Sequence, residues 1–181
     1  MPRLFVAIDL PETVKNQVLE LTRFGMRGVK WVNLDQFHLS LRFIGEVDQH
    51  SFESIKTCLS KIRGSTCNLT LNGIGTFPMN KNPRVIWTGV EKNELLGQVR
   101  NKVEHQLSQI GISSERRKYH PHVTLGRVKE NKIKGLGDYV AQYALFRSET
   151  FLVDNFVLFS SKLTPKGAIY TKEMTYPLDK K

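Results

Sequence analysis

Two tetrapeptides with the same chemical pattern occur in the chain, His38-Leu39-Ser40-Leu41 and His122-Val123-Thr124-Leu125. Each places an imidazole two residues before a hydroxyl, inside a segment that otherwise predicts a β-strand. Side chains two apart on a strand point to the same face, so each tetrapeptide presents a titratable ring beside an OH group. Two such pairs facing one groove supply a base, an acid and two donors for phosphate oxygens.

These residue types suit the opening or formation of a phosphodiester without a metal ion. An imidazole titrates near neutrality, so one ring can accept a proton from water while the other donates a proton to the departing oxygen. Ser40 and Thr124 can donate hydrogen bonds to the non-bridging oxygens, whose charge persists in the transition state. A single His-x-Ser is most often a structural feature, but its recurrence in two halves of the chain favours the catalytic interpretation.

Two arginines follow the tetrapeptides and are candidates for phosphate binding, because a guanidinium matches phosphate geometry. Arg42 has the strand parity to share the face of His38. Arg127 has the wrong parity to share the face of His122 unless Gly126 bulges the strand. The alternative for both arginines is a solvated surface charge or a contact with the nucleic-acid backbone.

Other residues around the second tetrapeptide admit more than one interpretation. His120 and His122 lie on one predicted strand face and could form a metal pair, but a carboxylate or third ligand is missing nearby, which disfavours a metal site. The basic run 115–119 could hold an RNA backbone, and its alternative is a solvated loop. Phe5, Phe43 and Tyr170 could stack a base in the groove, or belong to the core. His50 and His105 lie in predicted helices, and we expect them at the surface.

The chain has 181 residues and a formal net charge of +10, from 27 Lys+Arg against 17 Asp+Glu. Such a charge favours polyanionic partners, above all nucleic acid, although a basic surface can also serve solubility alone. Cys58 and Cys67 form no CxxC or ladder of spacings, so we expect neither a disulfide framework nor a cysteine metal site, and we expect a reducing cytoplasm. The apolar stretch at residues 4–8 is too short and too soon charged to span a membrane or form a signal peptide.

Hydrophobic periodicity predicts alternating strands and helices. Strands are expected at 3–10, 37–44, 66–77, 85–90, 121–128, 150–160 and 169–176, and helices at 12–23, 49–62, 93–109 and 132–145. The two histidines are 84 positions apart, and this offset brings most elements of 3–80 near those of 84–165. The pattern predicts an α+β fold built from a duplicated β-α-β-α-β unit. We expect one bilobal domain over 1–181, with interleaved lobes and mostly antiparallel sheets around a central groove.

The chain resembles the RNA 2′,3′-cyclic phosphodiesterase family, also called the 2′-5′ RNA ligase family, of the two-histidine phosphoesterases. The resemblance spans residues 3–8, 37–45 and 120–127 and covers nearly the whole length. It implies hydrolysis of terminal 2′,3′-cyclic phosphates to 2′-phosphates, with reversible 2′-5′ joining of RNA halves as a side activity and no metal or nucleotide cofactor. It also implies that His38 is the proton donor and His122 the proton acceptor, with Ser40, in place of the commoner threonine, and Thr124 holding the phosphate.

The substrate-binding residues expected on these grounds are Arg42, Arg127, Phe5, Tyr170, Leu41 and Leu125. The expected partner is an RNA end with a 2′,3′-cyclic phosphate, tRNA halves being candidates, and the expected state is a cytoplasmic monomer. Two alternatives remain. One is a related phosphoesterase acting on ADP-ribose cyclic phosphate, another nucleotide cyclic phosphate or 2′-5′ oligoadenylate, and the other is a non-catalytic module that binds RNA ends.

Overall fold

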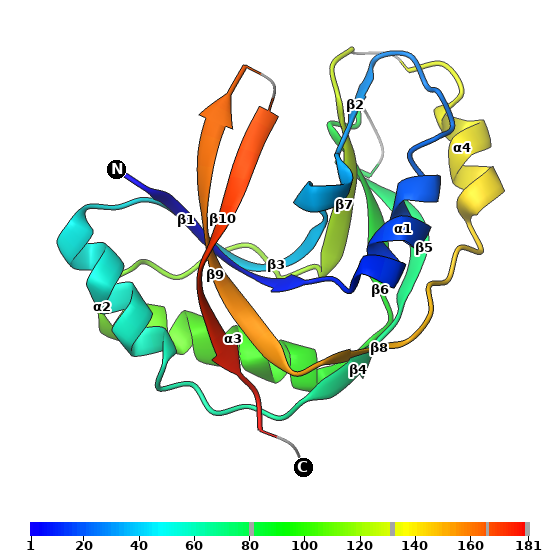
Figure 1. Cartoon of the computed structure of the whole chain (residues 1–181). Helices are drawn as coiled ribbons and strands as arrows, with labels where there is room; N and C mark the ends of the chain where they lie inside the picture. Colours follow the sequence, from blue (N-terminus) through cyan, green and yellow to red (C-terminus); the bar gives the residue numbers. More distant parts are fainter. Residues whose placement is uncertain (80–81, 131–132, 166, 180–181) are drawn as a thin grey trace.

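The computed structural model describes residues 1–79, 82–130, 133–165 and 167–179 (Figure 1). Alternating apolar residues form the strands, and apolar stripes at helical spacing form the helices. In chain order the elements are β1 (Arg3–Asp9), α1 (Glu12–Glu20), β2 (Val29–Trp31), the 3-10 helix η1 (Leu34–Gln36), β3 (His38–Glu46), α2 (Gln49–Leu59), β4 (Cys67–Leu69), β5 (Leu71–Phe77), β6 (Val85–Val90), α3 (Glu94–Gln109), β7 (His122–Val128), α4 (Leu136–Tyr143), β8 (Phe151–Val153), β9 (Asn155–Thr164) and β10 (Gly167–Pro177).

The strands form two lobes that meet along the centre of the molecule. The main sheet has the order β10-β9-β1-β3-β7-β6-β5, with β2 also paired to β7. The ladders between these strands are antiparallel, and β3 meets β7 at the single pair Leu39 and Val123. The β10-β9-β1-β3 lobe and the β7-β6-β5 lobe diverge on either side of this pair (Figure 1). The predicted α+β fold, with mostly antiparallel sheets, is confirmed.

The first helix of each half lies on the lobe of the other half (Figure 1). Helix α1 follows β1 in the chain but contacts η1 and lies on the side of the β7-β6-β5 lobe in Figure 1, and helix α3 follows β6 but packs against β3 and α2. Leu96, Val99, Val103 and Leu107 form the buried stripe of α3, and the Asn93 side chain caps its first turn by accepting from Leu96 N at 3.0 Å. Because the helices are exchanged, neither half of the sequence forms a lobe alone.

Several predicted boundaries differ from the structure. The strand predicted over 66–77 is divided at Thr70 into β4 and β5, and the strand predicted over 150–160 is divided at Asp154 into β8 and β9. In both places the chain leaves the small β4–β8 sheet to join the main sheet, which single-strand periodicity does not reveal. The helix predicted over 132–145 is observed as α4, and position 132 lies outside the described residues. The three-residue elements β2 and η1 were not predicted.

Candidate active site

The four side chains of the two tetrapeptides surround the point where the lobes meet. Leu39 and Val123 pair directly and are 0% exposed, so they point into the core. The residues on either side of each therefore point to the opposite face, the groove. Across this antiparallel pair His38 lies opposite Thr124, and Ser40 lies opposite His122. Opposed side chains on a ladder are about 5 Å apart and diagonal ones about 7–8 Å, so the two histidines occupy diagonal positions of this pair of strands.

The two histidines are oriented by the same backbone contact. Nδ1 of His38 lies 2.8 Å from the carbonyl oxygen of Gln36, and Nδ1 of His122 lies 2.7 Å from that of His120. A carbonyl oxygen only accepts hydrogen bonds, so both Nδ1 atoms carry the proton and donate it. Each Nε2 is then left to exchange a proton with a substrate. The hydroxyls of Ser40 and Thr124 make no hydrogen bond within the described part of the chain, so both remain available as donors.

Both imidazoles favour the neutral form in the free protein. Burial lowers the pKa of His38 from 6.5, against the hydrogen bond to Gln36, which raises it, and the charge of His122 lowers it further. Burial likewise lowers the pKa of His122 from 6.5, against the hydrogen bond to His120, with the charges of His120 and Arg127 adding to the decrease. The effect of His122 on His38 shows that they are electrostatic neighbours. A bound phosphate anion opposes these shifts and favours protonation of one ring.

A β-bulge in each lobe decides which arginine faces the groove. In β3, Leu41 is unpaired, because Ser40 pairs with Ala7 while Arg42 pairs with Val6. In β7, Leu125 is unpaired, because Thr124 pairs with Trp87 while Gly126 pairs with Ile86. Each extra residue reverses the alternation that follows it. Arg42 is thereby moved to the core face and Arg127 to the groove face.

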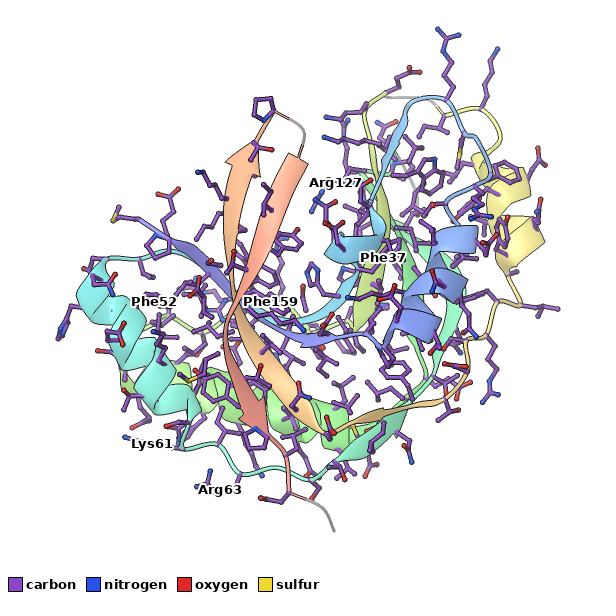
Figure 2. All side chains as sticks on the ribbon, viewed as in Figure 1. Phe37, Phe52, Lys61, Arg63, Arg127 and Phe159 are labelled. Atoms are coloured by element: carbon purple, nitrogen blue, oxygen red, sulfur yellow. The ribbon has the colours of Figure 1, made fainter. Side chains whose placement is uncertain are left out.

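Arg127 is the arginine of the groove. It is exposed and forms no ion pair among the described residues, and Lys30 of β2 pairs with it on the same face. Its charge contributes to the lowered pKa of His122 and opposes the rise in the pKa of Tyr170 on the other lobe. Figure 2 shows Arg127 on the side of β7 that faces the β9–β10 hairpin. The sequence analysis required a bulge near Gly126 for Arg127 to share the face of His122, and the structure has this bulge one residue earlier, at Leu125.

The expectation that Arg42 shares the face of His38 is wrong. Its side chain is 9% exposed and lies against α3, where Nε is 2.9 Å from Oε1 of Glu104. The contact is not aligned as a hydrogen bond, so the attraction is mainly Coulombic. The assignment of Leu125 to substrate binding is also wrong, because its side chain is 0% exposed in the core. Leu41 is 3% exposed in the same core and reaches the groove only as part of a cavity wall.

Aromatic rings surround each histidine. Around His38 lie Phe5, with ring centroids 4.8 Å apart, and Tyr170, at 5.3 Å, and Phe5 stacks in turn on Phe159. Tyr170 is half-buried beside His38, whereas Phe5 is 5% exposed and belongs to a small buried cluster, which is the core alternative stated from the sequence. Around His122 lie Phe77, at 5.0 Å, and Trp87, at 6.0 Å. These rings account for the burial that lowers both imidazole pKa values.

Asp9 lies across the ladder from His38, whereas the position across from His122 is occupied by Gly89. The Asp9 carboxylate is 2.7 Å from Nζ of Lys15 and 2.6 Å from Nζ of Lys172. Burial raises the pKa of Asp9, but the hydrogen bonds from the two lysines outweigh it and lower the pKa below 3.8. The negative charge of Asp9 raises the pKa of His38, and Lys15 opposes this effect. The environments of the two histidines are therefore not identical.

A cavity of about 620 Å³ opens beside His122. This volume lies within the range of about 300–1,000 Å³ typical of small-molecule sites. Ser40 and His122 are among the residues that line it. The lining also includes aromatic and basic side chains, among them Phe43, Phe77, Arg117, Lys118 and Tyr119. The space beside the catalytic candidates can accommodate an apolar ring with anionic groups attached.

Within the described residues, no group of three or more His, Cys, Asp or Glu side chains is placed to hold a metal ion. The rings of His120 and His122 are 6.5 Å apart, and the His120 ring packs on Trp87 at 4.8 Å. Nor is any helix of the described residues long and apolar enough to cross a membrane. Cys58 and Cys67 are buried and free.

Sequence reasoning missed several residues of the site. Trp87, Phe77 and Phe159 lie in predicted strands, but their facing depends on strand partners that the sequence does not reveal. Gln36 and His120 each precede a histidine by two residues, and this shared position was a usable signal. The 84-residue offset was a second usable signal, because it aligns Arg127 with Phe43 and not with Arg42, so the two arginines are not equivalent in the two halves.

Comparison with known proteins identifies relatives along almost the whole chain. A sequence profile of the 2′-5′ RNA ligase superfamily matches residues 10–164. A protein of Methanocaldococcus jannaschii named RNA 2′,3′-cyclic phosphodiesterase is 37% identical over 171 residues, covering 93% of this chain and 96% of that protein. A protein of Thermotoga maritima with the same name is 37% identical over 173 residues, covering 93% and 91%.

Solved structures share the fold. The crystal structure of E. coli LigT complexed with 3′-AMP has a TM-score of 0.80 at 27% identity, covering 98% of this chain and 99% of that chain. A protein of Thermus thermophilus has a TM-score of 0.82 at 24% identity, covering 97% of both chains. At the latter identity the similarity concerns the fold alone.

Proposed function

The chain belongs to the 2′-5′ RNA ligase superfamily, and from this membership we propose that it is an RNA 2′,3′-cyclic phosphodiesterase. The observation that carries the proposal is the arrangement at the β3–β7 junction. Two imidazoles and two hydroxyls that make no hydrogen bond among the described residues lie on one face of this pair of strands, and the Nδ1 atom of each imidazole is held by a backbone carbonyl. Relatives with this activity in their names, at 37% identity over 93% of the chain, support the same conclusion.

The reaction opens the cyclic ester with one water molecule. His122 Nε2 accepts a proton as the water oxygen attacks phosphorus, the bond from phosphorus to O3′ breaks, and His38 Nε2 donates a proton to O3′. The products are a 2′-phosphate and a free 3′-hydroxyl. The diagonal placement of the histidines suits this step, because the attacking and leaving oxygens lie on opposite sides of phosphorus. The presence of Asp9 on the His38 side, with no carboxylate opposite His122, supports His38 as the proton donor.

The hydroxyls and one arginine hold the phosphate. Ser40 and Thr124 donate to the non-bridging oxygens, and because the donors are held on paired strands they need little reorganisation as charge develops. Arg127 adds a guanidinium from the groove face of β7. The same step with an RNA 5′-hydroxyl replacing water as the nucleophile joins two RNA ends through a 2′-5′ linkage, and its reversal cleaves that linkage and re-forms the cyclic phosphate. No divalent metal has a role in this scheme.

The substrate class follows from charge and ring chemistry. A formal charge of +10 favours a polyanion. Tyr170, half-buried beside His38, offers a ring for the terminal nucleoside. RNA ends with a cyclic phosphate, including tRNA halves, meet both conditions. The free cysteines support a reducing cytoplasm, and we expect a monomer.

The test is incubation of the purified protein with an RNA oligonucleotide that ends in a 2′,3′-cyclic phosphate, with EDTA present. The expected product is the 2′-monophosphate, identified by chromatography against 2′- and 3′-phosphate standards. Unchanged RNA, or a 3′-phosphate, contradicts the proposal. Loss of activity in EDTA contradicts the metal-free mechanism and supports the metal interpretation of His120 and His122.

Single variants separate the alternatives. His38→Ala and His122→Ala are expected to lower kcat by orders of magnitude while retaining affinity for the RNA. A protein that only binds RNA ends has no turnover to lose. Faster hydrolysis of ADP-ribose cyclic phosphate or of 2′-5′ oligoadenylate than of the RNA end assigns the chain to the related phosphoesterases instead.

A further inference from the structure

We propose that Glu104 and Tyr119 are positioning residues that hold the segment 113–121, and through it His122, in the reactive geometry. The inference rests on the proposed function, because it concerns how that site is held together. The two lobes differ in how they hold the segment that precedes each catalytic histidine. Each catalytic histidine is oriented by a backbone carbonyl two residues earlier, so the segment that carries this carbonyl must be fixed.

The two carbonyl-bearing segments are fixed in different ways. The segment before His38 is attached through β2, which pairs with β7 from Val29 to Trp31, and Val32 N donates to Leu125 O at 2.9 Å. The segment 113–121 forms no strand and no backbone ladder with β3 in the described part of the chain. Its residues from Ser113 to Lys118 are exposed. Side chains must therefore supply the attachment.

A buried charge cluster replaces the missing ladder. The Arg42 guanidinium, moved to the core face by the bulge at Leu41, donates to Ser113 O and lies 3.7 Å from the Glu115 carboxylate. Glu104 of α3 holds Arg42 and accepts from Glu115 N at 3.3 Å. Its Oε1 is also 3.3 Å from Arg100. One carboxylate, 11% exposed, thus joins β3 to the start of the segment.

Tyr119 attaches the other end of the segment to the first tetrapeptide. Its hydroxyl donates to the carbonyl oxygen of Ser40 at 3.0 Å, and its ring lies under the Arg100 guanidinium at 5.2 Å. The next residue is His120, whose carbonyl orients His122. The contacts run without interruption from Glu104 through Tyr119 to both tetrapeptides. We call Arg42, Arg100, Glu104 and Tyr119 the loop anchor.

The test compares Glu104→Gln and Tyr119→Phe with controls of the same chemistry. Glu104→Gln keeps the side-chain shape and removes the charge, and its control is Glu91→Gln, which alters the exposed ion pair with Arg147. Tyr119→Phe removes only the hydroxyl, and its control is Tyr176→Phe, which removes a hydroxyl that donates to Lys56 O away from the groove. Both controls are expected to keep the wild-type kcat.

We expect kcat to fall about 10- to 100-fold in Glu104→Gln, because small displacements of a catalytic group cost factors of this size. In Tyr119→Phe we expect a fall of about 2- to 13-fold, equivalent to one neutral hydrogen bond. KM should change little, because Glu104 does not line the cavity and the Tyr119 hydroxyl that is removed is bound to Ser40 O. If Glu104→Gln does not fold, Tyr119→Phe still provides the test.

NMR distinguishes positioning from a general loss of structure. The Nδ1 protons of His38 and His122 are observed in ¹⁵N-labelled protein and assigned with the two alanine variants. In the anchor variants the His122 proton should exchange faster with water, while the His38 proton, held by Gln36, should not change. Equal loss of both signals, or no loss with kcat within twofold of wild type, overturns the proposal. The NMR result stands even if the wild-type protein does not open RNA cyclic phosphates, so the two proposals fail separately.

Discussion

Arg127→Met should lose activity and keep its stability, whereas Arg42→Met should lose stability, although each arginine follows its histidine by only four or five residues in the sequence. Arg127 is exposed and without an ion pair among the described residues, so its loss should leave the melting temperature unchanged. A hydrogen bond to a charged group contributes about 1.5–3 kcal/mol, so loss of the Arg127 contact with phosphate should lower kcat/KM about 10- to 150-fold. The salt dependence of RNA binding should weaken by about 0.7 in log–log slope.

Arg42→Met should instead reduce stability, because it removes a partner from the buried Glu104 carboxylate. Breaking a buried ion pair costs about 3–5 kcal/mol when the remaining charge has no other partner. Arg100 stays 3.3 Å from Glu104, which reduces the cost. We expect about 2–3 kcal/mol, which lowers the melting temperature of a chain of this size by about 4–12 °C. Because the segment 113–121 loosens, kcat also falls, but the salt slope of RNA binding stays that of the wild type.

The assay combines thermal unfolding followed by circular dichroism with steady-state hydrolysis of an RNA cyclic phosphate at several salt concentrations. Glu91→Gln serves as the control for loss of an exposed ion pair. If Arg127→Met lowers the melting temperature and keeps its activity, while Arg42→Met keeps its stability and loses phosphate affinity, the assignment of faces from the two β-bulges is refuted.

Three further outcomes are expected. The pH profile of kcat/KM should be bell-shaped with its acid limb below pH 6.5, because burial lowers the pKa of both His38 and His122; an acid limb above pH 7 contradicts these environments. Thr124→Val should lower kcat about 100- to 1,000-fold and leave Tm unchanged, since the hydroxyl donates only to the substrate. A clear decrease in Tm would indicate that the hydroxyl has a structural role instead. The free energy of unfolding should fall as pH drops from 7.5 to 5.5, because the imidazoles have pKa values near 6.5 in the unfolded chain and lower values in the folded protein, so the unfolded chain binds more protons. This pH dependence should be smaller in His38→Gln and His122→Gln. An unchanged slope of Tm against pH in both variants would show that other groups cause it.

Much of the fold and the centre of the site could be predicted from the sequence because they depend on local periodicity. Alternation along a single strand places His38 beside Ser40 and His122 beside Thr124, whatever the rest of the chain does. The 84-residue repeat of this pattern indicated two related halves and, with them, a shared groove. The long helices α2 and α3 were also predicted, since each carries a continuous apolar stripe.

What only the tertiary structure decided is the register between strands. A β-bulge is a property of a pair of strands, and neither Leu41 nor Leu125 differs from an ordinary strand leucine in the sequence. Each bulge reverses the faces that follow it, so Arg42 became part of the buried loop anchor and Arg127 became the groove arginine. Charge alone could not separate the two, because a guanidinium suits a buried carboxylate and a phosphate equally well, and only the partner strand determines which of them it meets.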